Sequence, residues 1–320
     1  MKILVFDANA EARSAYIEGL PNENLVFFDE PVSIDILKKH EDAEIISLFV
    51  TSVLGSDMID ASPNLKCIIA RSTGVDHIDR VYASKRKIIV CNVPSYGART
   101  VAEFTFALLL SLSRRTIDAA NRTKHTKNFA TEGLEGFDLF GKTLGVIGTG
   151  AIGKNVVALA TAFGMHVRMF DIFPNQTLES DSAHYVSLDD LLSSSDIITL
   201  HAPSTPETKH LLNEAAFEKI QRGVYIVNTA RGELIDSEAL LAALKDGRVA
   251  GAALDVLEDE RILKEKDTHH NRELIDLPSV LVTPHVAFYS KEAYTEILMT
   301  SIHNILAFQS GTPTHVVDTH

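Results

Sequence analysis

A glycine-rich turn between an apolar run and a helical run constrains the fold of this chain more than any other feature. Gly148, Gly150 and Gly153 follow the β-type run Thr143–Ile147 in the spacing Gly-x-Gly-x-x-Gly. The first glycine permits a tight turn, the second lets a phosphate approach the backbone, and the third lets the following helix pack closely on the strand. The segment therefore predicts a strand, turn and helix that bind a dinucleotide.

The next β-type run favours one of the two nicotinamide dinucleotides. This run, His166–Phe170, ends at Asp171, which is about 20 residues beyond the turn, as expected for an acid that binds ribose. A carboxylate at that point accepts hydrogen bonds from the adenosine ribose and repels a 2′-phosphate. We therefore predict NAD as the cofactor, with its phosphates near Ala151 and Ile152 at the helix start.

Short β-type runs alternate with helical patterns along the whole chain, in two series. Because parallel strands need long crossovers, which are usually helices, this alternation predicts an α/β fold with parallel sheets. We expect two Rossmann-like or flavodoxin-like lobes, each with a doubly wound parallel sheet. The first series has its predicted strands at 2–6, 25–28, 45–49, 65–70 and 87–90. The second series has them at 143–147, 166–170, 196–200, 224–228, 250–254 and 280–283.

The last apolar helix, predicted at 293–308, comes after the strands of the second series and needs a partner for its apolar face. The first series offers an open sheet face, so we expect the chain to return to it. The predicted NAD-binding domain, 100–289, is then inserted into a discontinuous substrate domain made of 1–99 and 290–320. The charged, histidine-rich stretch 259–272 is predicted to be an exposed loop or a short surface helix.

The charge and the cysteine content argue against several classes of protein. The 320 residues carry a formal net charge of −13, which repels a phosphate backbone, so we expect no nucleic-acid partner. The two cysteines, Cys67 and Cys91, lie in apolar runs, as buried thiols in a reducing compartment do. The longest apolar stretch, 104–112, is too short to cross a bilayer core of about 30 Å. We therefore expect a cytoplasmic protein without a membrane partner.

Three polar side chains follow the last strands of the second series, at the edge where parallel sheets bind ligands. Arg231, Glu260 and His285 each come shortly after one of the last three predicted strands. A nicotinamide enzyme that reduces a keto acid needs a cation for the carboxylate, polarisation of the carbonyl oxygen and a nearby proton donor. A guanidinium, a carboxylate and an imidazole at one edge can supply these functions. Glu258, two residues before Glu260, is the alternative carboxylate.

At these residues the chain resembles the D-isomer-specific 2-hydroxyacid dehydrogenase family, over essentially its full length. The resemblance is carried, in the family's order, by the blocks 148–153, 228–232, 255–260 and 283–285. The aromatic pair after His285 and the long chain between Glu260 and His285 are most similar to the D-lactate dehydrogenase branch. Leu257 departs from the family, which usually has an aromatic residue there, and the loop 71–77 varies the usual first-domain sequence.

The resemblance implies a role for each of the three side chains. His285 would protonate the carbonyl oxygen as hydride arrives and would accept the proton in the reverse reaction. Glu260 would pair with His285 and favour the protonated ring. Arg231 would hold the 2-keto acid through its planar fork, which suits a carboxylate better than an ammonium does. The implied reaction is the NAD-dependent interconversion of a 2-keto acid, most simply pyruvate, and a D-2-hydroxy acid.

The resemblance also implies the walls of the two binding sites. Backbone N–H groups around Thr73, Gly74 and Val75 would bind the substrate carboxylate, and Tyr96 and Phe288 would line the pocket. The other predicted cofactor contacts lie near strand ends of the second series: His201, Ala202, Pro203, Thr229, Ala230, Arg231 and Asp255. No side-chain spacing indicates a metal site. The family favours a homodimer formed through the NAD-binding domain.

Two other functions stay open at this point. One is a sister activity on the same scaffold, such as a glyoxylate, hydroxypyruvate or phosphoglycerate dehydrogenase, although no cluster of cations for a phosphate is evident. The other is an NAD-sensing protein that binds the cofactor without turnover, which would not need all three polar groups. The apolar helical run 100–115 is either covered within the chain or forms a subunit contact.

Overall fold

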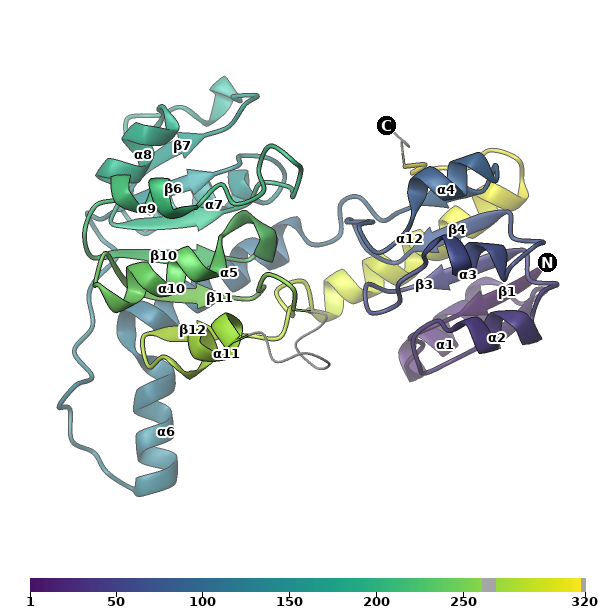
Figure 1. The fold of residues 1–320 in the computed structure, drawn as a ribbon, viewed down its shortest axis with the longest axis horizontal. Coiled ribbons are helices and arrows are strands. Elements are labelled where there is room, and N and C mark those ends of the chain that lie inside the picture. Colours follow the sequence, from purple (N-terminus) through teal and green to yellow (C-terminus); the bar gives the residue numbers. More distant parts are fainter. Residues whose placement is uncertain (261–268, 318–320) are drawn as a thin grey trace. The chain divides into compact units, whose positions relative to one another are not determined.

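The structure is a computed structural model that describes residues 1–260 and 269–317. All pairings between its strands are parallel. The strands form one sheet of five and one of seven, with helices around each (Figure 1). The sheets belong to two units of the chain, Met1–Tyr96 with Ser290–His320, and Gly97–Tyr289. The predicted α/β class with two doubly wound sheets, one inserted into the other's chain, is confirmed.

The first unit contains the five-stranded sheet, in the order β2-β1-β3-β4-β5. Its strands are β1 (Lys2–Val5), β2 (Asn24–Phe27), β3 (Ile45–Leu48), β4 (Cys67–Ala70) and β5 (Ile89–Cys91). Its helices are α1 (Ala10–Gly19), α2 (Ile34–Lys39), α3 (Ser56–Asp60), α4 (Arg80–Lys85) and α12 (Lys291–Gln309). Every residue of β3 and β4 is buried, as expected for central strands with helices on both faces.

The second unit contains the seven-stranded sheet, in the order β12-β11-β10-β9-β6-β7-β8. Its strands are β6 (Thr143–Ile147), β7 (His166–Phe170), β8 (Ala183–Tyr185), β9 (Ile197–Leu200), β10 (Val224–Asn228), β11 (Val249–Leu254) and β12 (Val280–Val282). Its α-helices are α5 (Ala98–Arg114), α6 (Thr116–Thr126), α7 (Gly153–Ala162), α8 (Leu188–Ser194), α9 (Glu214–Lys219), α10 (Ser237–Lys245) and α11 (His269–Asp276). The strand order reverses between β6 and β9, and a ligand crevice is expected at the carboxyl ends of such a pair.

The two long apolar helices are covered within their own units. In α12, nine residues are buried, and a Cβ on Gly19 of α1 would lie 2.7 Å from the Ile302 side chain, so the two helices pack closely. The predicted return of the last helix to the first series is thus confirmed. In α5, seven residues are buried, and side chains from it share a core with β6, α7 and β7. The sequence left open what covers α5, and this core supplies the cover.

Several predicted elements differ from the observed ones for local reasons. The strand predicted at 87–90 is observed at Ile89–Cys91, because Lys87 has φ of +58°, a turn conformation. The strand predicted at 65–70 begins only at Cys67, since the Leu65 N–H donates to Ser62 in a turn. β8 and α6 were not predicted at all. Within the stretch 259–272, α11 begins at His269, and 261–268 lie outside the described residues.

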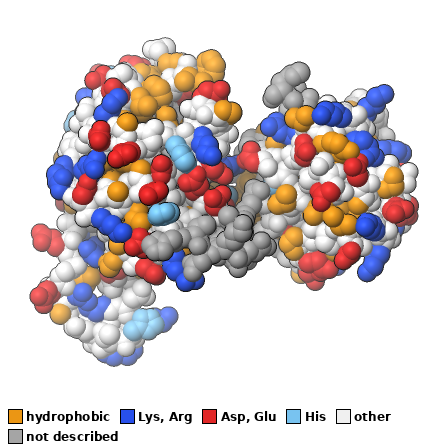
Figure 2. All heavy atoms as spheres, in the orientation of Figure 1, with side chains coloured by type: hydrophobic (Ala, Val, Ile, Leu, Met, Phe, Trp, Pro, Cys, Tyr) orange, Lys and Arg blue, Asp and Glu red, His pale blue; other side chains and the backbone are white. Residues whose placement is uncertain are grey.

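The surface carries both signs of charge. On the face shown in Figure 2, basic and acidic side chains are interspersed on each unit, so the net charge of −13 is not gathered into one acidic patch there. Across the described ranges, no helix combines the length and the apolar content that crossing a membrane requires.

Candidate active site

The turn after β6 has the backbone geometry that its glycines predict. Gly148 has φ of +90°, which favours glycine, and a Cβ there would lie 2.7 Å from the carbonyl carbon of His201. A Cβ on Gly153 would lie 2.0 Å from the Gly148 carbonyl oxygen, so α7 can pack on the turn only with glycine here. A Cβ on Gly150 would meet nothing within 4 Å. The turn is therefore packed on one side and open on the other.

The open side of this turn fits the pyrophosphate of a dinucleotide. Gly150 and Ala151 are exposed and Ile152 is half-buried, directly before the first residue of α7. A helix start offers free N–H groups and the positive end of the helix dipole, and both favour an anion. The open space at Gly150 leaves room for that anion at the backbone.

Asp171, directly after β7, is held against the glycine turn. Its Oδ2 atom accepts the backbone N–H of Thr149 at 2.7 Å and the Thr149 hydroxyl at 3.1 Å. Its Oδ1 atom accepts the N–H of Phe173 at 2.9 Å. The Thr149 hydroxyl also bonds the hydroxyl of Tyr185 at 2.7 Å, which accepts the N–H of Asn175 at 3.0 Å. The carboxylate predicted to bind ribose is thus fixed beside the turn predicted to bind phosphate.

Sequence reasoning missed Tyr185 because it ends β8, a strand of only three residues. So short a run shows no period, and the strand becomes visible only through its pairing with β7, where Tyr185 lies opposite Met169. The only sequence feature that could have indicated Tyr185 is its type, a tyrosine shortly before the start of α8.

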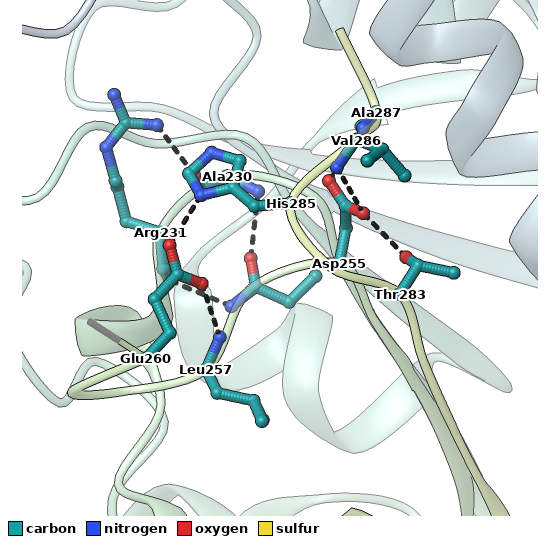
Figure 3. A network of polar contacts seen from close by, with 10 residues as sticks. Ala230, Arg231, Asp255, Leu257, Glu260, Thr283, His285, Val286 and Ala287 are labelled. Carbon is teal, nitrogen blue, oxygen red and sulfur yellow. Dashed lines mark hydrogen bonds and ion pairs between the residues drawn. The ribbon is translucent and has the colours of Figure 1, made fainter. Parts of the chain in front are cut away.

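His285 and Glu260, from two different loops, form a direct side-chain pair (Figure 3). Nδ1 of His285 lies 2.5 Å from Oε1 of Glu260, with the two side chains 35% and 30% exposed. The other carboxylate oxygen accepts the backbone N–H of Leu257 at 3.2 Å, which orients the carboxylate. Because Nδ1 faces Glu260, Nε2 is the ring nitrogen suited to exchange a proton with a ligand.

A buried carboxylate holds the turn that carries His285 (Figure 3). Asp255, 1% exposed, accepts the Thr283 hydroxyl at 2.6 Å and the N–H groups of Val286 and Ala287 at 3.0 and 2.8 Å. Burial raises the pKa of Asp255, and these three hydrogen bonds oppose the rise. His285 itself has φ of +54°, and its N–H donates to the Asp255 carbonyl at 2.9 Å. The carboxylate is thus engaged with the His285 turn, and its predicted cofactor contact stays a prediction.

Arg231 extends from the loop after β10 and lies with His285 and Glu260 in one close view (Figure 3). Its Nη1 donates to the Ala230 carbonyl at 2.8 Å. The buried Asn228 fixes the loop, since its side chain donates to the Arg231 carbonyl at 2.8 Å and accepts the Ala230 N–H at 3.0 Å. The structure thus brings together the three side chains predicted to be catalytic, at the carboxyl edge of the seven-stranded sheet.

The other predicted cofactor residues of the second unit lie along the same edge. Thr229 and Ala230 are 7% and 8% exposed, and the Thr229 hydroxyl bonds that of Thr105 in α5 at 2.8 Å. A Cβ on Gly148 would lie 2.7 Å from the Ala202 nitrogen, so the 201–203 segment borders the glycine turn; Pro203 is exposed. Their contacts with a cofactor stay predictions.

His201 is excluded as the proton donor by its surroundings. Its Nε2 bonds the Thr199 hydroxyl at 2.9 Å, while Nδ1 is buried and has no hydrogen-bond partner in the described part of the chain. Burial lowers the pKa of His201 to about 3. A ring that stays neutral near pH 7 cannot deliver a proton as an imidazolium, so His201 is not suited to act as the proton donor.

In the first unit, the predicted carboxylate-binding loop follows β4. The Thr73 hydroxyl donates to the Val93 carbonyl at 2.8 Å, and Asn92 donates to the Thr73 carbonyl at 2.8 Å. Val75 is 7% exposed and packs in the first-unit core. The hydroxyl and the carbonyl of Thr73 therefore already form hydrogen bonds within the protein. This is consistent with the prediction that the loop binds a carboxylate through its N–H groups.

The predicted site residues are divided between the units. Thr73, Gly74, Val75 and Tyr96 belong to the first unit, whereas the three polar side chains and Phe288 belong to the second. The Phe288 ring lies 5.6 Å from that of Tyr289. That both sets bind one substrate stays a prediction. Among residues 1–260 and 269–317, no three His, Cys, Asp or Glu side chains are grouped as a metal ion would require.

Comparison with known proteins agrees with this geometry. Residues 106–287 match the family described as D-isomer specific 2-hydroxyacid dehydrogenase, NAD binding domain. The chain is 38% identical to a D-lactate dehydrogenase of Escherichia coli, with 90% of each chain covered. It is 37% identical to a glycerate dehydrogenase of Methylorubrum extorquens, covering 89% of this chain and 88% of that one.

A solved structure supports the same assignment. D-lactate dehydrogenase of Aquifex aeolicus, complexed with NAD and lactic acid, matches with a TM-score of 0.88 and 37% identity, over 97% of this chain and 96% of that one. The resemblance predicted from four sequence blocks is therefore confirmed, as is NAD as the cofactor. The chain belongs to the D-isomer-specific 2-hydroxyacid dehydrogenase family of NAD-dependent oxidoreductases, with its NAD-binding domain in the second unit.

Proposed function

We propose that this protein is a D-lactate dehydrogenase, which reduces pyruvate with NADH to D-lactate and catalyses the reverse reaction. The observation that carries the proposal is the direct pairing of His285 with Glu260, next to Arg231 at the edge of the NAD-binding domain. Two relatives that match over nine-tenths or more of this chain are D-lactate dehydrogenases.

Substrate binding in this proposal depends on Arg231 and on the first unit. The Arg231 guanidinium binds the keto acid through parallel hydrogen bonds to its carboxylate and neighbouring carbonyl oxygen. Backbone N–H groups of Thr73, Gly74 and Val75 bind the remaining carboxylate oxygen. The first unit thus serves as the substrate domain and the second as the cofactor domain. Arg231 also polarises the carbonyl, because its positive charge stabilises the negative charge that develops on that oxygen.

Proton transfer is assigned to His285. When bound, NADH supplies a hydride to the carbonyl carbon. His285 Nε2 donates a proton to the carbonyl oxygen, which becomes the hydroxyl of the product. Glu260, 2.5 Å from Nδ1, stabilises the protonated ring before this step and holds its orientation. In the reverse reaction the neutral His285 accepts the hydroxyl proton.

The test is a substrate screen that follows NADH oxidation with pyruvate, phenylpyruvate, 2-ketoisocaproate, glyoxylate and hydroxypyruvate. Pyruvate should give the highest kcat/KM, and NADPH should be a poorer cofactor because the fixed Asp171 carboxylate repels a 2′-phosphate. A clear preference for hydroxypyruvate or glyoxylate would replace the lactate assignment with the sister activity, which the glycerate dehydrogenase relative supports. Tight NADH binding without turnover of any keto acid would favour the sensor instead.

We also propose that the protein is a homodimer formed through its second unit. The helix α6 has no buried residue and extends away from the sheet of its own unit (Figure 1). Ile117 on this helix and Phe129 just beyond it are 42% and 83% exposed, which is typical of an association surface. Light scattering after gel filtration should give the mass of a dimer, and Ile117→Glu with Phe129→Glu should give a monomer. A monomeric wild-type protein would contradict this proposal.

A cytoplasmic location is proposed from the thiols. Cys67 and Cys91 lie on the neighbouring strands β4 and β5, are both buried and form no disulfide. Buried free thiols are typical of proteins from reducing compartments. Fractionation of the source cells should place the activity in the soluble cytoplasmic fraction, and recovery in a secreted fraction would contradict it.

A further inference from the structure

The two loops that carry Arg231 and Glu260 touch through their backbones. A Cβ on Gly232 would lie 2.1 Å from the Leu257 carbonyl carbon and 2.4 Å from the Glu258 nitrogen. Only a glycine permits so close an approach. The position of Glu260 is therefore coupled to that of Arg231.

His210, in the loop before α9, connects the same two loops through other atoms. Its backbone N–H donates to the Glu233 carbonyl at 2.8 Å, on the Arg231 loop. Its Nε2 lies 2.6 Å from Oε1 of Glu258, on the Glu260 loop. Its Nδ1 lies 3.9 Å from the carboxylate of Asp236, where the Arg231 loop ends and α10 begins. One residue therefore contacts both loops, by main chain and by side chain.

The backbone of His210 is itself held in an uncommon conformation. Its φ of +51° lies in the left-handed region, where few residues with a large side chain are found. Two residues later, the Leu212 N–H donates to the Leu234 carbonyl at 3.0 Å, a second bond to the Arg231 loop. These contacts present the ring to Glu258.

Glu258 is fixed from its other side as well. Asn271 of α11, 3% exposed, donates from Nδ2 to the Glu258 carbonyl at 2.5 Å. The sequence left Glu258 and Glu260 as alternative partners of the catalytic histidine. In the structure each pairs with its own histidine, Glu258 with His210 and Glu260 with His285.

We infer that His210 is a positioning residue, which bridges Glu233 and Glu258 and so aligns Glu260 with His285 and Arg231. The inference rests on the proposed function, because it concerns the geometry of the same site. The His210 and Glu258 side chains are 33% and 21% exposed, and ion pairs with that much solvent contribute little to overall stability. The alignment of a catalytic pair, in contrast, affects the rate steeply.

The test uses a variant that leaves the backbone undisturbed. Asparagine tolerates the left-handed region, so His210→Asn preserves the turn while its short side chain cannot reach Glu258. Glu258→Gln keeps a hydrogen-bond acceptor and removes the charge. The matched control is His184→Asn, since His184 forms a surface pair with Glu179 at 3.5 Å in the same unit, away from these loops.

We expect kcat for keto-acid reduction to fall about tenfold in His210→Asn, with NADH affinity changed by less than about twofold. The primary isotope effect with 4-deuterated NADH should rise, because chemistry becomes slower relative to product release. Amide hydrogen exchange should accelerate in residues 255–260 but not in the glycine turn. Glu258→Gln should have a smaller effect, the double variant should be no worse than His210→Asn, and His184→Asn should match the wild type.

Two results would overturn the inference. One is unchanged exchange in residues 255–260 of His210→Asn, and the other is an active variant whose kcat and isotope effect equal those of the wild type. A wild-type protein that reduces no keto acid would contradict the proposed function but not the role of His210. The exchange measurement would still decide whether His210 holds the Glu260 loop.

Discussion

The loops proposed to bind substrate are built differently in the two units. In the second unit, the loops carry the titratable side chains Arg231, Glu260 and His285, and a buried polar residue fixes two of these loops: Asp255 for the His285 turn and Asn228 for the Arg231 loop. In the first unit, the loop Thr73, Gly74 and Val75 has no charged side chain, and a hydroxyl and a neighbouring amide fix it.

This difference separates two tasks. The polar side chains proposed to act on the reacting atoms lie in the second unit, in the domain that also binds NAD, and buried groups fix the loops of Arg231 and His285. The first unit is proposed to recognise a carboxylate through main-chain N–H groups, which a side-chain substitution does not remove. Substitutions should therefore be far more harmful in the second unit than in the first.

The largest effect is expected for His285→Gln. Glutamine keeps a polar side chain but cannot deliver a proton at neutral pH, so kcat should fall by about a thousandfold, with NADH affinity nearly unchanged. Steady-state kinetics and fluorescence titration of NADH measure the two quantities. The control is His166→Gln, an exposed histidine at the amino end of β7, which should keep wild-type kcat. Near-normal turnover of His285→Gln would mean that another group supplies the proton.

Arg231→Lys should have the next largest effect. Lysine keeps the charge but loses the planar fork, so kcat/KM for pyruvate should fall by about a hundredfold, chiefly through KM. The matched control is Arg248→Lys, which changes a surface arginine paired with Asp246 and should leave kcat/KM for pyruvate unchanged. If Arg231→Lys and Arg248→Lys behaved alike, the guanidinium would have no part in holding substrate.

The stability of the second unit should depend on pH through His201. Burial lowers its pKa to about 3 from an ordinary 6.5, so below pH 6.5 the unfolded chain takes up a proton that the folded chain does not. Stability is therefore lost as pH falls from 6.5 toward 3, by about 1 to 2 kcal/mol between pH 7 and 5. Urea unfolding at both pH values should show a smaller loss in His201→Gln. An equal loss of stability in the wild type and in His201→Gln would show that His201 is not the cause of the pH dependence.

The smallest effect is expected in the first unit, from Thr73→Val. This change removes the hydrogen bond from the Thr73 hydroxyl to Val93 but keeps every backbone N–H group. KM for pyruvate should rise by no more than about fivefold, the equivalent of one net hydrogen bond, and kcat should be unchanged. A hundredfold loss would show that the side chain binds substrate, and the proposed division between the units would fail.

The parts of the site that could be predicted from the sequence are those that depend on strand order alone. Arg231, Glu260 and His285 each follow a strand of the same parallel sheet, and parallel strands bring their carboxyl ends to one edge whatever the loops do. Two acids two residues apart cannot be told apart by strand order, so the choice of Glu260 over Glu258 as the partner of His285 rested on the position of Glu260 in the family's sequence block.

The residues that could not be predicted depend on long-range contacts. His210 reaches Glu258 across 48 positions and Thr149 reaches Tyr185 across 36, and neither pair shares a period or a motif. The left-handed conformations of Lys87 and His285 depend on neighbouring chain segments. The sequence therefore did not predict the start of β5 or the end of β12 correctly. The helix α6 has no buried face, and hence no apolar period to indicate it.

The most direct test of the account is the configuration of the product. Pyruvate and NADH are incubated with the purified protein, and the lactate formed is resolved on a chiral column alongside NADH consumption. A carboxylate held by Arg231 and a carbonyl oxygen facing His285 present one face of the substrate to the hydride, so a single enantiomer should form. Membership of the D-isomer-specific family makes D-lactate the expected product, one molecule per NADH. Formation of L-lactate, or no NADH oxidation with any 2-keto acid, would contradict the account.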